Sequence, residues 1–260
     1  MLNIATHNKL FHADEVSAVA LLKIFVDKDI KVHRVEHNTT EFKNYDMVVD
    51  ISRKYDGVKF FDHHQNKGGK SSAGLIWSYI GLEKNYPKIS KLVKLIDAHD
   101  VGDAKAGAFE YPNLIRCFNT NDIYDKSLQD SAFEEAVEFA IKIFTSLKDA
   151  QDEMLKAKDI LKNSYLFDNN PAILYLDTFT KHWTTYINGE LTPHIKAVVW
   201  EDENDAKFKV KVVPKRVGSF ELNAKKLPQD NSMEFVHSAG FFAVAKDEQS
   251  MQNYLKKVRL

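Results

Sequence analysis

The first half of the chain alternates short apolar runs with segments of helical periodicity. Runs rich in β-branched and aromatic residues predict strands at 2–6, 31–36, 47–51 and 58–61. Apolar residues at helical spacing predict helices at 14–25, 71–80 and 90–96. Strands separated by helices are typical of an α/β fold with a doubly wound, mostly parallel sheet and helices on both faces.

The second half begins with a long helical segment at 131–165 and becomes rich in strands after a turn at 167–171. Strands are predicted at 172–176, 195–200 and 208–213, and a helix at 250–258. We therefore expect three parts, namely a first domain at 1–125, a helical connector at 126–168 and a smaller C-terminal α/β domain at 169–260.

Histidines and aspartates stand at the ends of several predicted strands. His7 follows the first strand, Asp50 closes the third, and Asp62-His63-His64 follow the fourth. Ligands of open α/β sheets bind at the carboxyl ends of the strands, so the pattern gathers these side chains along one edge of the sheet.

Imidazoles and carboxylates without thiolates suit manganese, iron, cobalt or zinc better than calcium. Further groups of this kind are His12 and Asp14 upstream and Asp97-Ala98-His99-Asp100 downstream. Two ions roughly 3.5–4 Å apart can hold a phosphate and activate a water, which requires a carboxylate able to bridge them. Asp50 is the natural candidate for that bridge.

Each of these residues alone has a simpler interpretation. Asp50 could be a turn residue and Asp14 a helix cap, and His7 could be a core histidine. Two adjacent imidazoles, His63 and His64, are harder to dismiss, because they repel each other when charged and need partners when buried. Taken together, the motifs favour a metal centre.

The acid-rich segment 97–100 leaves its metal ligand open. Asp97 and Asp100 share one helical face, so one could bind metal while the other caps the helix or supports a ligand histidine. We favour Asp100, because Val101-Gly102 mark the end of the helix.

Composition limits the partners and the compartment. A formal net charge of -1 provides no general attraction to nucleic acid or anionic membrane, so a polyanion site must be a local patch. The single cysteine, Cys117, excludes an intramolecular disulfide and is expected to be a buried packing residue. No secretory signal and no apolar run of roughly 20 residues is visible, so we expect a cytoplasmic protein without a membrane span.

Several motifs together resemble those of a known family. The chain carries Thr6-His7-Asn8, Phe11-His12-Ala13-Asp14-Glu15, Asp62-His63-His64-Gln65, Ser71-Ser72-Ala73-Gly74-Leu75, Gly218-Ser219-Phe220-Glu221-Leu222 and Val236-His237-Ser238-Ala239-Gly240-Phe241. Asp62-His63-His64 with the upstream ligands resembles the DHH phosphoesterase superfamily. The whole set, in this order, resembles the Myg (melanocyte proliferating gene) family, which is related to that superfamily.

The resemblance implies a two-domain phosphoesterase with its active site in a cleft and a DHH-like metal-binding catalytic domain at 1–125. It implies two divalent ions, with manganese favoured and magnesium, cobalt or zinc as alternatives. The implied ligands are His7, His12, Asp14, Asp50, His63 and Asp100 or Asp97. His64 would face the phosphate. The family has been described as metal-dependent protein hydrolases and as 3′-to-5′ RNA exonucleases.

Candidate substrate-binding residues lie in three places. Ser71, Ser72 and Gly74 open a helix, where backbone N–H groups suit a phosphate, although serine is equally good as a helix cap. His237 and Gly240 lie in a loop of small residues that could also be an ordinary turn. Arg216 follows a strand that has lysines on one face. Such a face is more commonly exposed to solvent than used to bind nucleic acid.

The metal-ligand pattern and this resemblance together predict a metal-dependent phosphodiesterase, with Asp50 and His64 as catalytic residues. The resemblance implies single-stranded RNA or a short oligonucleotide as substrate. A small-molecule phosphatase or pyrophosphatase and a non-enzymatic nucleotide-binding regulator are the alternatives.

Overall fold

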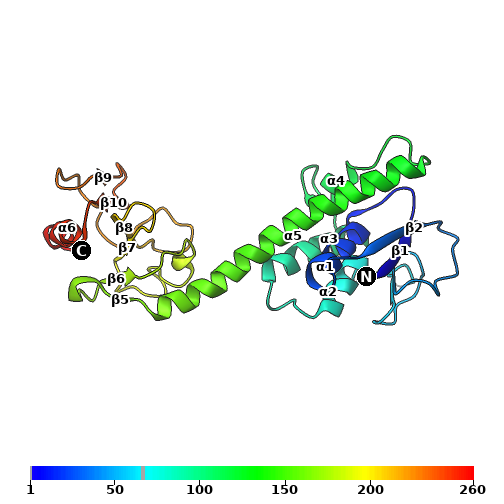
Figure 1. Cartoon of the computed structure of the whole chain (residues 1–260), viewed down its shortest axis with the longest axis horizontal. Coiled ribbons are helices and arrows are strands. Elements are labelled where there is room, and N and C mark those ends of the chain that lie inside the picture. The colour runs from blue at the N-terminus through cyan, green and yellow to red at the C-terminus, as the bar shows by residue number, and fades with distance from the viewer. Residues whose placement is uncertain (1, 66–67) are drawn as a thin grey trace. The chain divides into compact units, whose positions relative to one another are not determined.

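Four parallel strands form the first sheet, in the order β2-β1-β3-β4. Figure 1 labels β1 and β2 of this sheet. In the computed structural model, which describes residues 2–65 and 68–260, these strands are β1(Asn3–His7), β2(Lys31–Val35), β3(Met47–Val49) and β4(Phe60–Phe61). All three residues of β3 are buried. A short, continuously apolar run of this kind is typical of a parallel strand covered on both faces.

The first unit also contains the helices that pack around this sheet. They are α1(Ala13–Phe25), α2(Ser72–Ile80), α3(Pro87–Asp100), α4(Tyr111–Arg116) and the beginning of α5(Lys126–Lys162). Every α1 residue from Ala13 to Leu22 is buried, and α1 packs against α2, α3 and α4. A helix apolar on almost all sides belongs in a core, and here it holds its N-terminus firmly beside the strand ends.

The strand predicted at 58–61 is shorter in the structure. An oxygen of Asp56 accepts the backbone N–H groups of Val58, Lys59 and Phe60. This turn occupies the start of the apolar run, and Val58 is exposed. Pairing with β3 therefore begins only at Phe60.

The second unit contains a mixed six-stranded sheet in the order β5-β6-β7-β8-β10-β9, in which only the β6–β7 pair is parallel among the described pairs. Its elements are β5(Tyr165–Leu166), β6(Ile173–Leu176), β7(Ala197–Glu201), β8(Phe208–Val212), β9(Phe235–Val236), β10(Phe242–Ala245) and α6(Glu248–Val258), with short 3-10 turns at Phe167–Asn169 and Trp183–Thr185.

The chain divides into the units Met1–Gln151 and Asp152–Leu260, and α5 contributes residues to both. The predicted α/β class is confirmed, with a parallel N-terminal sheet, a long helix and a C-terminal sheet. The three-part division at 1–125, 126–168 and 169–260 stays a prediction. Within the described residues, no helix is both long and apolar enough to cross a membrane.

The prediction for Cys117 was wrong. This residue is exposed at the end of α4, where it is the C-cap. The apolar residues that line the core from this helix are Tyr111 and Ile115, and Cys117, two positions after Ile115, lies on the opposite side of the helix.

Candidate metal centre

The strand ends and two helix ends of the first unit meet in one buried cluster. His7 ends β1, Asp50 follows β3, and His63 follows β4. The N-terminus of α1 adds His12, Asp14 and Glu15, and the C-terminus of α3 adds Asp100. Among the described residues, four overlapping groups bring three such ligand atoms within 4.8 Å of one another: His7, His12 and Glu15; Asp50, His63 and His64; Asp14, His63 and Asp100; and Asp14, Glu15 and Asp50.

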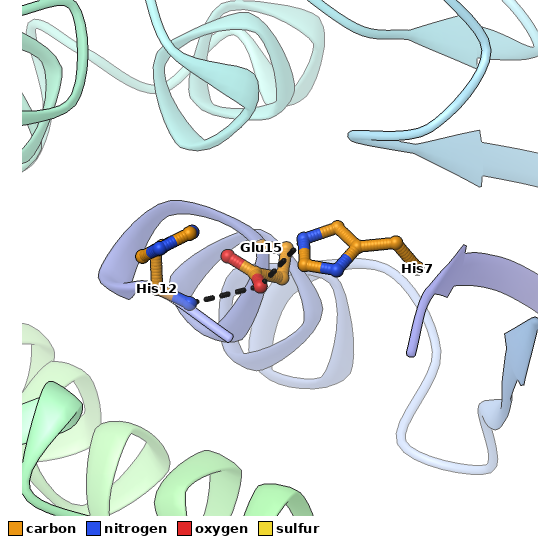
Figure 2. Close-up of side chains that lie close together, drawn as sticks. All are labelled: His7, His12 and Glu15. Atoms are coloured by element: carbon orange, nitrogen blue, oxygen red, sulfur yellow. Dashed lines mark hydrogen bonds and ion pairs between the residues drawn. The ribbon is translucent and has the colours of Figure 1, made fainter. Parts of the chain in front are cut away.

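Glu15 holds the first set of histidines together. Its Oε1 lies 3.0 Å from His7 Nε2 and accepts the backbone N–H of His12 at 2.9 Å. Figure 2 shows its carboxylate between His12 and the His7 ring. The other ring nitrogen, His7 Nδ1, lies 2.9 Å from the carbonyl oxygen of Asn8. A backbone partner at Nδ1 orients the ring so that Nε2 faces the cluster.

His63 belongs to a second set. Its Nε2 lies 3.0 Å from Asp100 Oδ2 and 3.4 Å from Asp50 Oδ1. The nearby carboxylates, that of Asp100 first and then that of Asp50, raise the pKa of His63 to about 10. Burial by itself would lower the pKa of His7, but the charge of Glu15 and the bonds with Asp50 raise it to about 11. Both rings therefore lie where the chain concentrates negative charge.

Asp50 contacts both sets through different oxygens. Its Oδ2 lies 3.3 Å from His7 Nε2, and its Oδ1 lies 3.4 Å from His63 Nε2. The hydroxyl of Ser72 donates to Oδ1 at 3.0 Å and fixes the carboxylate. A buried carboxylate held in this way, with one oxygen toward each histidine, has the arrangement needed to bridge two cations.

The surroundings of Asp14 indicate whether cations would fit the cluster. Both of its side-chain oxygens are buried and have no hydrogen-bond partner among the described residues, and the same is true of Glu15 Oε2. Burial and the negative charge of Asp50 raise the pKa of the Asp14 carboxyl well above its usual range. Buried oxygens without partners are costly, and a bound cation would satisfy them. The donor set of imidazoles and carboxylates therefore fits divalent metal ions.

Asp62 supports the neighbouring His64 ring. Asp62 is fully buried and its Oδ1 accepts from the His64 backbone N–H at 2.9 Å, with His64 Nδ1 at 2.8 Å. Half of the His64 side chain is exposed, and it lines a cavity of about 390 Å³. The other residues that line this cavity are His7, Lys9, Leu10, His12, His37, Asp50, Ile51, Arg53, Asp62 and Ile123.

The two aspartates of α3 have different neighbours. Asp100 contacts His63, as described above, whereas Asp97 Oδ1 accepts from the Ser71 N–H at 2.9 Å and from its hydroxyl at 2.7 Å. A Cβ added at Gly74 would lie 2.3 Å from the same oxygen. The geometry therefore favours Asp100 as the ligand and Asp97 as the group that holds the start of α2.

The serines predicted to bind substrate are buried. Ser71 donates to Asp97, and Ser72 donates to Asp50. Because both hydroxyls already have carboxylate partners, the geometry favours a positioning role for them. Their direct contact with substrate stays a prediction, as does that of Gly74.

Sequence reasoning missed two residues at this site, Glu15 in the cluster and His37 beside it. Glu15 follows His12 by three positions, the spacing at which a first-turn glutamate reaches back to the helix N-cap, and this spacing could have identified it. His37 stacks on the His7 ring, with centroids 4.7 Å apart and an interplanar angle of 26°. No motif surrounds His37, so only the fold reveals its position.

The other predicted substrate residues lie in the second unit. Arg216 is exposed at a cavity of about 380 Å³, and His237 packs against Phe241 with ring centroids 4.3 Å apart. Gly240 has φ +70°, and a Cβ there would lie 2.7 Å from Lys226 Cβ. Another cavity of about 340 Å³ is lined by Phe220, which is fully exposed, with Phe241 and Lys211.

The lysines near β8 are largely neutralised. The predicted alternation is confirmed, with buried Phe208 and Val210 on one face. However, Lys207 pairs with Glu234, and Lys209 lies 2.7 Å from Asp202 and 3.3 Å from Asp205. This strand face is therefore not a strong patch for a polyanion.

The comparisons with known proteins agree on one family. The model of the MYG1 exonuclease family, described as an uncharacterised protein family (UPF0160), matches residues 3–257. A MYG1 protein of Saccharomyces cerevisiae is 28% identical, covering 97% of this chain and 94% of the relative. The MYG1 exonuclease of Bos taurus is 24% identical over 92% of this chain and 79% of its own length. That of Homo sapiens is 35% identical over 30% of this chain and 25% of its own.

Proposed function

Because the chain belongs to the MYG1 exonuclease family, we propose that it is a metal-dependent phosphodiesterase that removes nucleotides from the 3′ end of RNA or short oligonucleotides. The observation that carries this proposal is the buried Asp50 carboxylate, which directs one oxygen toward each histidine set. A similarly placed bridge is what a two-metal phosphoesterase requires.

The two sets divide the candidate ligands. His7 and His12, which group with Glu15, would hold one ion, and His63 and Asp100, which group with Asp14, the other. Asp50 contacts His7 and His63 and would serve both. Bound divalent ions would supply the positive charge that holds the substrate phosphate and the acidity that activates a water. Manganese is favoured, with magnesium, cobalt or zinc as alternatives.

His64 would act on the substrate. Asp62 occupies its Nδ1, so Nε2 is the nitrogen left to donate a proton. From the wall of the cavity, His64 could stabilise charge on the phosphate or protonate the leaving oxygen. Asp62 would hold the ring in the required orientation.

The second unit contains the other predicted substrate-binding residues. His237, Gly240 and Arg216 stay the predicted contacts, and the exposed ring of Phe220 offers a surface on which a base can stack. We further propose that the enzyme works in the cytoplasm, where a reducing environment suits the exposed thiol of Cys117.

A substrate panel tests this function against its alternatives. Purified protein would be given manganese with pyrophosphate, a dinucleotide or labelled single-stranded RNA, and compared with Asp50→Ala and His63→Ala. We expect cleavage of RNA or dinucleotide that both substitutions abolish. Cleavage of pyrophosphate alone would favour a small-molecule phosphatase, and binding without turnover would favour a regulator. Unchanged turnover in both variants would contradict the metal mechanism.

A further inference from the structure

Three non-glycine residues that line the candidate active-site cavity have left-handed backbone conformations. They are Lys9 with φ 63°, Asp50 with φ 56° and Arg53 with φ 51°. Asp50 already belongs to the metal cluster, whereas Lys9 and Arg53 have no role in it. Glycine would adopt this conformation at lower cost, so cations at both positions call for an explanation.

Buried groups fix the backbone at each cation. The carbonyl oxygen of Lys9 accepts from Arg34 Nη2 at 2.5 Å and from Gln129 Nε2 at 2.9 Å. The N–H of Arg53 donates to the buried carboxylate of Asp62 at 2.7 Å. The loop after β1 and the loop after β3 are thus each held in a way that brings a cationic residue to the same cavity.

Both cations are available to an anion. Lys9 Nζ lies 3.7 Å from Glu36, but 40% of the lysine side chain and 60% of the glutamate side chain are exposed, so this pair stabilises little. In the part of the chain that the structure describes, Arg53 has no ion pair. Neither side chain can ligate a metal, because ammonium and guanidinium groups have no acceptor.

We propose that Lys9 and Arg53 bind a second phosphate of the substrate, adjacent to the phosphate that is cleaved at the metal cluster. Lys9 and Arg53 line the same cavity as His64, so both can meet an anion that enters it. Arginine forms paired hydrogen bonds with phosphate and lysine adds a point charge. This inference rests on the proposed function and narrows its substrate class: the site selects chains with at least two successive phosphates over an isolated phosphodiester.

Glycine substitutions provide a clean test. Lys9→Gly and Arg53→Gly remove the charge while suiting the positive φ, so neither should disturb folding. Arg259→Gly is the matched control, because Arg259 is a cation with φ 52° at the C-cap of α6 in the second unit. Arg53→Lys retains a charge without the paired hydrogen bonds and should fall between Arg53→Gly and the native protein.

The first measurement compares kcat/KM for a dinucleoside monophosphate with that for the same dinucleotide carrying one extra terminal phosphate, at its 5′ or its 3′ end. We expect the native protein to prefer a doubly phosphorylated form by about tenfold or more, the value of a charge-assisted hydrogen bond. Each glycine variant should reduce this preference about tenfold, and Arg259→Gly should retain it. A native protein without the preference, or variants that keep it, would overturn the proposal.

The second measurement separates this proposal from the catalytic one. Binding of a fluorescent, terminally phosphorylated trinucleotide is followed by anisotropy in EDTA at increasing salt. Each glycine variant should lower the slope of log K against log salt by about 0.7, the value for one lost phosphate contact on a single strand. An unchanged slope, or no binding by the native protein at low salt, would contradict the subsite. A changed slope without any cleavage would retain the subsite and reject the proposed hydrolysis.

Discussion

Asp97 and Asp100 lie three residues apart on α3 and have different partners. Asp100 lies beside His63 in the cluster, whereas Asp97 accepts two hydrogen bonds from Ser71. The sequence favours Asp100 only through the helix end at Val101-Gly102, and it leaves Asp97 open as the alternative ligand. The side-chain contacts separate the two roles.

Alanine at each position should have a different effect. Asp100→Ala should lower the amount of metal bound per chain, measured by elemental analysis after dialysis. Asp97→Ala should keep that amount but lower the free energy of unfolding by about 1–3 kcal/mol, because Ser71 loses a buried acceptor. Loss of metal from Asp97→Ala with full retention in Asp100→Ala would reverse the assignment.

Asp62 should act through His64. Asp62→Asn keeps the size of the side chain but removes the charge that orients the His64 ring, so kcat should fall about 10–100-fold with bound metal unchanged. Asp56→Asn is the control, because Asp56 lies in the loop between β3 and β4, which Asp62 contacts through the Arg53 N–H, and it accepts backbone N–H groups without touching a histidine. Equal losses of kcat in the two variants would point to the loop instead.

At the scale of elements, α2 begins against the carboxylate of Asp97 with no room for a side chain at Gly74. Replacing glycine with alanine inside a helix usually stabilises it by about 1 kcal/mol. Here the added Cβ would meet the Asp97 oxygens, so Gly74→Ala should instead destabilise the protein by about 1–3 kcal/mol.

A double variant checks the cause of this loss. In an Asp97→Ala background the carboxylate is gone, and Gly74→Ala should then become neutral or stabilising in urea denaturation. A loss of the same size in both backgrounds would place the clash elsewhere.

Elements with a strong apolar pattern were predictable, and short or irregular ones were not. The segments at 14–25 and 2–6 are mostly apolar and are mostly buried in α1 and β1, and the strand at 208–213 alternates as β8 does. The two-residue strands Tyr165–Leu166 and Phe235–Val236 have too few residues to show any period, and they form only because longer neighbours pair with them. Pairing of this kind is decided by tertiary structure.

Much of the candidate site could be predicted from the order of strands along the chain. His7, Asp50 and His63 stand at strand ends, and parallel strands bring their carboxyl ends to one edge. His37 follows β2 and reaches the His7 ring only through the packing of this sheet, which sequence spacing does not encode. The exposure of Cys117 was missed because a short apolar neighbourhood does not reveal where α4 ends.

At the scale of the molecule, the candidate metal centre belongs to one of two units with separate cores. The core beside the cluster contains residues from Ile4 to Phe144, whereas the cores of the second unit contain residues such as Phe167, Trp183 and Tyr254. A ligand held entirely by the first unit should therefore stabilise that unit.

Hydrogen exchange should detect this asymmetry. Manganese at about 100 times its Kd should stabilise the native protein by about 2.7 kcal/mol. Increased amide protection should appear in peptides covering β1, α1 and β3, with little change in peptides covering β7 and β8. EDTA should remove the effect, and Asp50→Ala should lack it. Equal protection of both units would contradict a site confined to the first.

The left-handed backbone conformation at Lys9 and Arg53 lowers thermal stability at positions where the side chains are proposed to bind substrate. Each residue carries a conformational cost of roughly 1–3 kcal/mol that glycine would largely avoid. A selection for heat resistance alone, after random mutagenesis, should therefore accept glycine at these positions. The resulting proteins would be more stable but would bind substrates with successive phosphates more weakly. Stabilising substitutions for this protein are better sought outside the cavity, because the strained backbone at these two positions places residues that activity needs.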